Sequence, residues 1–217
     1  MKPRLETTEY VIKGKAYCMA ELYLVLGLGN PGPQYAATRH NIGQLVLDLL
    51  AARTGVQFKK LPRTNAVIAE TRLSAPPAPK VVLAKSLTYM NQTGGPTAAL
   101  ARYYKIAPEQ IIAIHDDVDL PYGAIRLKQG GGEGGHNGLR DMSKALGTRD
   151  YLRVRLGVGR PPGNQDTADF VLKQFSATER SSLALFLDDA ADATTKLITD
   201  GLLATQQDFH SRPNPGA

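Results

Sequence analysis

The chain has 217 residues, 42% hydrophobic and 21% charged, with a net charge of +6, which is enough to bury one globular core and favours an anionic partner. A single cysteine, Cys18, excludes an intramolecular disulfide and a thiolate metal cluster, and predicts a reducing, cytoplasmic setting. No apolar run approaches the roughly 20 residues that span a bilayer, and no apolar run follows the first positive charges, so we expect neither membrane insertion nor secretion.

Strands and helices are predicted to alternate along most of the chain. Residues 1–20 lack clear periodicity and are expected to be an extension, followed by one globular domain over 21–210 and a tail over 211–217. Apolar runs and alternating patterns predict strands at 22–28, 67–73, 81–84, 111–114, 124–128 and 151–158. Apolar stripes predict four helices, one from after His40 to Gly55 and the others at 96–104, 139–146 and 183–198. This order predicts the α/β class, as a single domain with a twisted mixed sheet flanked by helices in a three-layer sandwich.

Three polar stretches follow predicted central strands, at 30–41, 86–91 and 116–119. In open α/β sheets the functional crevice lies beyond the carboxyl ends of such strands. We therefore expect these stretches to converge.

The first stretch begins with a G-x-G-x-x-G spacing at Gly27, Gly29 and Gly32, which is shared with dinucleotide-binding loops. A dinucleotide loop needs a helix that opens at the glycines and an acidic residue after the next strand. Here prolines flank Gly32, and the helix is predicted to begin some eight residues later. The pattern favours a rigid turn that delivers His40 to a helix start.

His40 and Asp116 form the most informative pair. A carboxylate at a strand end can accept a hydrogen bond from one imidazole nitrogen, which fixes the tautomer and raises the basicity of the other. Such a pair removes a proton from water, so hydrolysis needs no activated serine or cysteine. Asn41 is most simply a helix N-cap, and Asp117 a residue of a solvated turn.

Three asparagines, Asn30, Asn91 and Asn137, lie in glycine-adjacent turns. Individually each could satisfy its own turn backbone, but together at the expected crevice they resemble neutral groups that hold a peptide-like backbone.

The loop over 130–138 has six glycines in nine residues, which is compatible with a mobile lid, an anion-binding nest or a flexible connection. The loop lacks the Gly-Lys-Ser/Thr ending of a P-loop, so we do not expect ATP or GTP chemistry.

Two strands flanking that loop are rich in cations. Alternation places Arg126 and Lys128 on one face of the first strand, and Arg153 and Arg155 on one face of the second. If the strands are neighbours, these four side chains form a cationic surface beside the crevice. Edge strands also carry cations merely to prevent aggregation, but next to a hydrolytic site a phosphate clamp is the better interpretation.

Four motifs together resemble the bacterial peptidyl-tRNA hydrolase family: GLGNPGPQYAATRHNIG (27–43), KSLTYMNQTG (85–94), HDDVDLPYG (115–123) and GGGEGGHNGLRDM (130–142). The resemblance spans about 22–209. It implies a phosphorylase/hydrolase-like fold and makes 21–210 the catalytic domain. It further implies a cytoplasmic, monomeric enzyme of translation that binds tRNA and cleaves the ester between peptide and terminal ribose, with no metal or cofactor.

The resemblance also implies residue roles. His40 is similar to the family's general base, Asp116 to the residue that keeps it basic, and Asn30 to the position that distinguishes a blocked amine from a free one. Positions that bind the peptide and the 3′ end correspond to Tyr35, Tyr89, Met90, Asn91 and Asn137. A clamp for the tRNA 5′ phosphate corresponds to Lys128 and Arg155.

Two other functions remain open at this point. One is a metal-dependent phosphoesterase with the ligands His40, Asp116, Asp119 and His136, although no tight ligand motif is present. The other is an RNA-binding module without chemistry, against which the low aromatic content of 6% argues.

Overall fold

The computed structural model describes residues 8–12, 15–19 and 22–212. Strands β1 (Thr8–Ile12) and β2 (Lys15–Met19) pair as an antiparallel hairpin that is not part of the main sheet. The sequence pattern gave no sign of these strands, which lie in the segment expected to be an extension.

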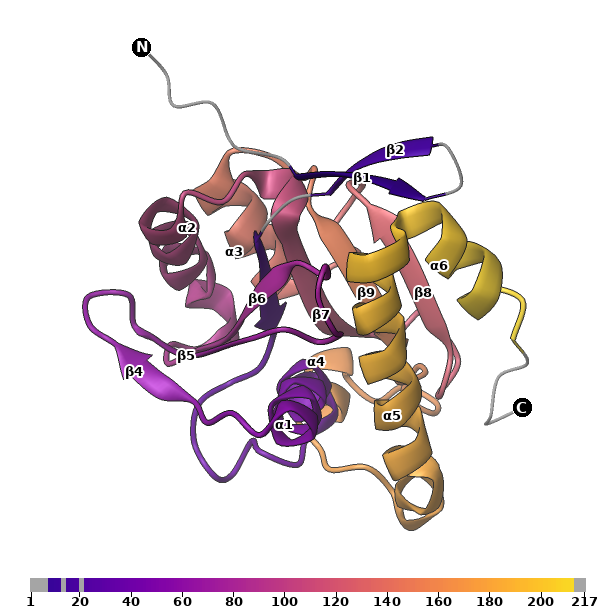
Figure 1. The fold of residues 1–217 in the computed structure, drawn as a ribbon. Coiled ribbons are helices and arrows are strands. Elements are labelled where there is room, and N and C mark those ends of the chain that lie inside the picture. The colour runs from indigo at the N-terminus through magenta and orange to yellow at the C-terminus, as the bar shows by residue number, and fades with distance from the viewer. Residues whose placement is uncertain (1–7, 13–14, 20–21, 213–217) are drawn as a thin grey trace.

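A seven-stranded mixed sheet forms the centre of the molecule (Figure 1). Its order is β4-β5-β6-β3-β7-β9-β8. The four strands from β6 to β9 in this order are parallel, and β5, β4 and β8 are added antiparallel at the edges. The strands are β3 (Leu22–Gly27), β4 (Lys59–Leu61), β5 (Ala66–Thr71), β6 (Lys80–Ser86), β7 (Ile111–Asp117), β8 (Ile125–Gln129) and β9 (Leu152–Gly157).

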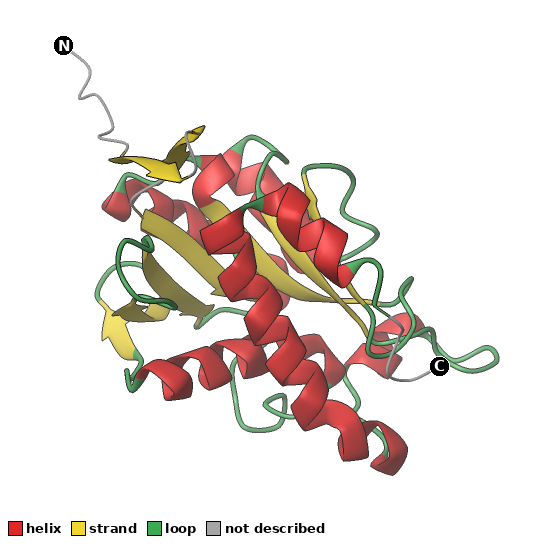
Figure 2. Ribbon diagram, turned by 45° about the vertical axis from the view of Figure 1, so that its right-hand side comes forward, coloured by secondary structure: helices red, strands yellow, loops and turns green. Residues whose placement is uncertain are grey.

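Helices cover both faces of this sheet (Figure 2). The α-helices are α1 (Ile42–Thr54), α2 (Gly94–Tyr104), α3 (Asn137–Leu146), α4 (Thr167–Val171), α5 (Ala177–Asp200) and α6 (Leu202–Phe209). Short 3₁₀ turns are η1 (Arg39–Asn41), η2 (Met90–Gln92) and η3 (Pro108–Gln110). The predicted α/β class and mixed sheet are confirmed, whereas β4, α4 and α6 were not predicted. Within the described residues, every helix is too short or too polar to cross a membrane.

Alternate side chains of the central strand β3 belong to two separate cores. Val25 packs with residues of α1 and α5, while Leu24 and Leu26 pack with residues of α2 and α3. A helix layer, the sheet and a second helix layer therefore form the predicted three-layer sandwich.

Two glycines of the first motif allow α1 to approach the sheet closely. A Cβ on Gly43 would lie 2.2 Å from the carbonyl oxygen of Ile114, and one on Gly27 would lie 2.4 Å from that of Gly43. Neither distance is possible for a side chain, so only glycine permits this contact. The close approach brings η1, which carries His40, to the carboxyl end of β7.

Helix α6 protects the exposed edge of β8. The backbone N–H of Leu127 donates to Nε2 of His210 at 2.9 Å, and Nε2 of Gln206 donates to the carbonyl of Leu127 at 2.9 Å. Side chains of α6 and its end therefore satisfy polar groups that would otherwise offer a template for strand pairing.

Candidate active site

A cleft of about 700 Å³ opens beyond the carboxyl ends of β3, β6 and β7. Its lining includes residues from each of the three polar stretches, among them His40, Met90 and Asp116. The stretches therefore converge, as their positions after the central strands predicted.

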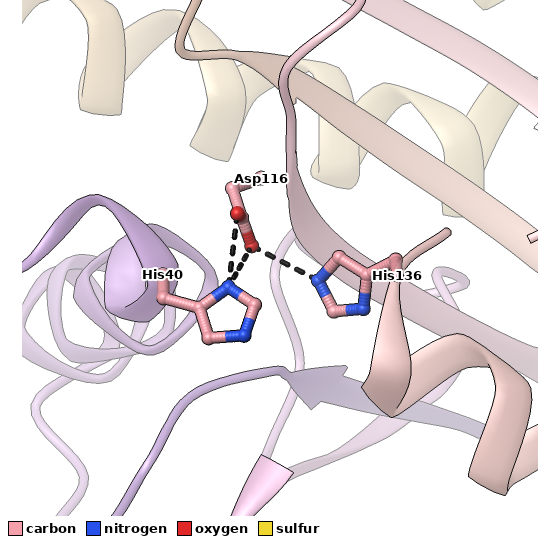
Figure 3. A group of neighbouring side chains, drawn as sticks. All are labelled: His40, Asp116 and His136. Carbon is pink, nitrogen blue, oxygen red and sulfur yellow. Dashed lines mark hydrogen bonds and ion pairs between the residues drawn. The ribbon is translucent and has the colours of Figure 1, made fainter. Parts of the chain in front are cut away.

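His40 and Asp116 are in direct contact (Figure 3). Nδ1 of His40 lies 2.9 Å from each carboxylate oxygen, so it donates its proton to Asp116 and leaves Nε2 as a lone pair. His40 lines the cleft, and among the residues that the structure describes none bonds to Nε2. Burial alone would lower the pKa of His40, but the charge and hydrogen bond of Asp116 outweigh burial, and the pKa is raised above its ordinary value.

His136 is a second partner of Asp116. Its Nε2 lies 2.9 Å from Oδ1 of Asp116, and its Nδ1 accepts the backbone N–H of Leu139 at 3.3 Å, which caps α3. The proton of a neutral His136 is therefore on Nε2, and both ring nitrogens are occupied. Burial would raise the pKa of Asp116, but the two imidazoles hold it well below its usual range, so Asp116 remains a carboxylate.

The sequence pattern named His136 only as a possible metal ligand. Its position just before a predicted helix was a signal for a cap, but spacing along the chain could not show that Asp116 lies within reach. His115 was missed as well. It is buried, its ring packs edge-on against His136 with centroids 5.0 Å apart, and burial followed by the charge of His136 lowers its pKa well below the ordinary value.

Three of the four residues in the metal hypothesis do come together. One possible ligand atom from each of His40, Asp116 and His136 lies within 4.8 Å of the others, whereas Asp119 pairs with Arg160. If His136 bound a metal through Nε2, a neutral ring would carry its proton on Nδ1, facing the Leu139 N–H donor to donor. The donor set therefore fits a hydrogen-bonded triad better than a metal site.

Asn41 occupies the predicted N-cap position of α1, but its side chain makes no capping hydrogen bond. Its buried side chain instead bridges the backbone of Asn30, accepting from the N–H and donating to the carbonyl, both at 2.9 Å. The side chain of Asn30 accepts the backbone N–H of Met90 through Oδ1 at 2.8 Å. Because Oδ1 is occupied, Asn30 presents its NH₂ group as a donor in the cleft wall.

The remaining residues assigned to the substrate lie around this cleft. Tyr89, Asn91 and Asn137 line it, and the first of these is 52% exposed. Tyr35 is not among the lining residues, but its ring packs edge-on against Tyr89 with centroids 6.3 Å apart. Oδ1 of Asn137 accepts a hydrogen bond from Arg140 at 3.3 Å.

A further part of the cleft wall comes from α4 and its end, which the sequence did not reveal. Val171 and Leu172 line the cleft on this side. Buried Arg39 ties α4, the following turn and α5 to η1. It donates to the carbonyls of Phe170 at 3.4 Å and Gln174 at 2.9 Å, and it forms a 2.6 Å ion pair with Glu179. Arg39, the residue next to His40, therefore holds this part of the cleft wall in place.

The two cationic strands are neighbours, as the cationic-surface interpretation required. β8 and β9 are paired, and their register sets Arg126 opposite Arg155 and Lys128 opposite Arg153. Arg155 forms a 2.8 Å ion pair with Asp117, so Asp117 is not merely part of a solvated turn. The prediction was wrong for Arg153, which is 1% exposed and donates to loop carbonyls instead of joining the cationic surface.

Comparison with known proteins connects this geometry to one family. The family model described as peptidyl-tRNA hydrolase matches residues 24–216. A peptidyl-tRNA hydrolase of Arthrobacter sp. (strain FB24) is 55% identical over 193 residues, covering 89% of this chain and 98% of that protein. One of Kineococcus radiotolerans is 55% identical over 197 residues, covering 89% and 99%. The crystal structure of peptidyl-tRNA hydrolase from Acinetobacter baumannii superposes with a TM-score of 0.82 at 33% identity, over 90% of this chain and 98% of that one.

Proposed function

This chain belongs to the peptidyl-tRNA hydrolase family and cleaves the ester bond between peptide and tRNA, and we propose that His40 is the general base of this reaction. The observation that carries the proposal is the pairing of Nδ1 with Asp116, which leaves Nε2 as the only free imidazole lone pair of the two histidines on Asp116. The raised pKa of His40 supports it, because a stronger base takes a proton from water more readily.

In this proposal a water molecule donates its proton to Nε2 as its oxygen attacks the ester carbonyl. The carboxylate of Asp116 stabilises the imidazolium that forms. As the bond between the acyl carbon and the ribose oxygen breaks, the imidazolium returns the proton to that oxygen. The products are a free carboxyl on the peptide and a free hydroxyl on the tRNA, and the step requires no metal or cofactor.

Asn30 is proposed to select blocked substrates. Its NH₂ group donates to an acceptor such as the carbonyl that blocks the amine of a peptidyl chain. A free aminoacyl group presents an ammonium at this point, which is itself a donor and gains nothing from a second donor. The enzyme would discriminate against the free aminoacyl substrate because that substrate leaves the NH₂ group of Asn30 unpaired in the cleft.

The other substrate contacts are proposals of the same kind. We place the peptide and the 3′ end along Tyr35, Tyr89, Met90, Asn91 and Asn137, and the 5′ phosphate at Lys128 and Arg155. All of the peptide and 3′-end residues except Tyr35 line the cleft. Lys128 and Arg155 lie on the neighbouring strands β8 and β9, and Arg155 pairs with Asp117, which also lines the cleft.

We also propose that the enzyme acts in the cytoplasm as a monomer, and that residues 1–20 and 211–217 lie outside the catalytic domain. The first bound is supported by the match of the family model, which begins only at residue 24, and by β1, which pairs only with β2 among the described strands. The same match runs to residue 216, so it does not support the second bound. Full activity of a chain that spans 21–210 and sediments as a monomer supports the two domain bounds and the oligomeric state; loss of turnover in that chain contradicts the bounds.

The decisive assay measures ester cleavage on N-acetylated and free aminoacyl-tRNA, each with and without a strong chelator. We expect turnover of the acetylated substrate, little of the free one, and no effect of the chelator. Inhibition by the chelator that is reversed by added divalent metal would overturn the metal-free mechanism. Equal turnover of both substrates would overturn the role of Asn30.

A further inference from the structure

Arg153 is an arginine that the strand pattern places among surface cations but that the fold buries. It shares a face of the sheet with Lys128, its register partner on β8, yet only 1% of it is exposed. No carboxylate forms an ion pair with it among the described residues, and burial lowers the pKa of its guanidinium. A buried cation without a carboxylate is costly, so its contacts are informative.

The guanidinium holds the base of the glycine-rich loop. Nη1 donates to the carbonyl of Gly132 at 2.7 Å and Nη2 to that of Gly131 at 2.9 Å. Gly131 has a φ of +82°, in the left-handed region, and a Cβ there would lie 3.1 Å from Nζ of Lys128. The two bonds therefore fix a backbone shape that the loop sequence alone leaves free.

The same arginine is connected to the helix that the loop enters. Its guanidinium packs over the ring of Tyr151 at 4.7 Å, and the hydroxyl of Tyr151 donates to the carbonyl of Leu139 at 3.2 Å in α3. Only residues 133–135 separate Gly132 from His136. Both ends of this short segment are held, one by Arg153 and the other by the contact of His136 with Asp116.

We propose that Arg153 is a positioning residue of the hydrolase, which fixes the Gly131–Gly132 carbonyls so that His136 and Asn137 meet the cleft in the productive geometry. It acts through the loop and touches neither the substrate nor the water. The inference rests on the proposed catalytic roles of His40 and Asp116. It also separates Arg153 from the clamp residues beside it, because a loop that shapes the cleft matters for every substrate, with or without a 5′ phosphate.

The test compares Arg153→Met and Arg153→Lys on full peptidyl-tRNA and on a short 3′-end mimic without a 5′ phosphate, below the melting temperature of each variant. For Arg153→Met we expect kcat to fall about tenfold or more on both substrates, because small displacements at a catalytic centre are costly. Arg153→Lys keeps the charge but cannot bridge two carbonyls in the same way, so its kcat should lie between that of the wild type and that of Arg153→Met. Arg53→Met, which removes an exposed arginine paired with Asp188 and Asp192 on α5, controls for stability loss and should keep wild-type kinetics.

Loss confined to the substrate with a 5′ phosphate would overturn the proposal and make Arg153 a clamp residue. A lowered melting temperature with normal kcat on the mimic would also overturn it, leaving a purely structural role. If Arg153→Met does not fold, Arg153→Lys decides: wild-type kinetics on both substrates contradict the proposal. If His40→Ala retains turnover, the catalytic assignment itself fails, whereas an inactive His40→Ala with normal Arg153 variants overturns only this inference.

Discussion

Two imidazoles meet the same carboxylate at the same distance, yet the segments that carry them give them different chemistry. His40, on the turn before α1, and His136, at the start of α3, each place a nitrogen 2.9 Å from Asp116. The second nitrogen of His136 accepts the helix N–H of Leu139, while that of His40 has no bond to a described residue and belongs to the cleft lining. The ring nitrogen that does not contact Asp116 is therefore what distinguishes His40, the proposed base, from His136.

The largest expected effect breaks this pair at His40. His40→Ala removes the free lone pair, and we expect kcat to fall about 10³-fold, within the range of general base catalysis. His136→Ala removes a donor to Asp116 but no base, so a loss of about tenfold is expected, equivalent to one net hydrogen bond. The measurement is single-turnover cleavage of peptidyl-tRNA, with circular dichroism to confirm folding. Equal losses in the two variants would contradict the distinction between the histidines.

A second change alters the carboxylate that the two rings share. As the proposed base, His40 is active when neutral, and Asp116 raises its pKa, so kcat/KM of the wild type is expected to decline as pH falls through that raised value. Asp116→Asn removes the charge, burial then dominates, and the pKa of His40 drops. We expect the acid limb of the pH profile to move to lower pH, while the plateau falls about 100-fold because the tautomer is no longer fixed. An acid limb that stays in place would show that Asp116 does not set the basicity of His40.

The outcome for individual residues shows which parts of this arrangement a sequence can reveal. Periodicity located the central strands because burial on both faces leaves a continuous apolar run. The position of polar residues after those strands located the cleft, because parallel strands end at one edge of the sheet. Both inferences depend only on residues that are close together in the sequence: those of one strand and those directly after it.

Contacts between residues far apart in the chain could not be predicted from the sequence, for a physical reason. Alternation assigned Arg153 to the correct face, but burial depends on the loop that folds over it, and the six glycines of that loop specify no single backbone conformation. Asn41 occupies the position of an N-cap, yet the backbone of Asn30, 11 residues earlier, competes successfully for its amide. Helix α6 was missed because its role, the protection of β8, exists only once the sheet has formed.

The smallest expected effect concerns the proposed phosphate clamp, Lys128 and Arg155, and tests whether it acts separately from the cleft. Lys128 has no ion pair within the described part of the chain, whereas Arg155 is already paired with Asp117, so the two cations are not equivalent. Lys128→Ala removes one charge; Arg155→Ala removes a charge and also leaves Asp117 facing the phosphate uncompensated. We expect KM for substrates with a 5′ phosphate to rise about fivefold for the first, the scale of one exposed ion pair, and further for the second. Both increases should shrink as ionic strength rises, since screening weakens exposed contacts most. The control is the same substrate without its 5′ phosphate: an equal rise in KM there would show that these side chains act on the cleft instead of on the phosphate.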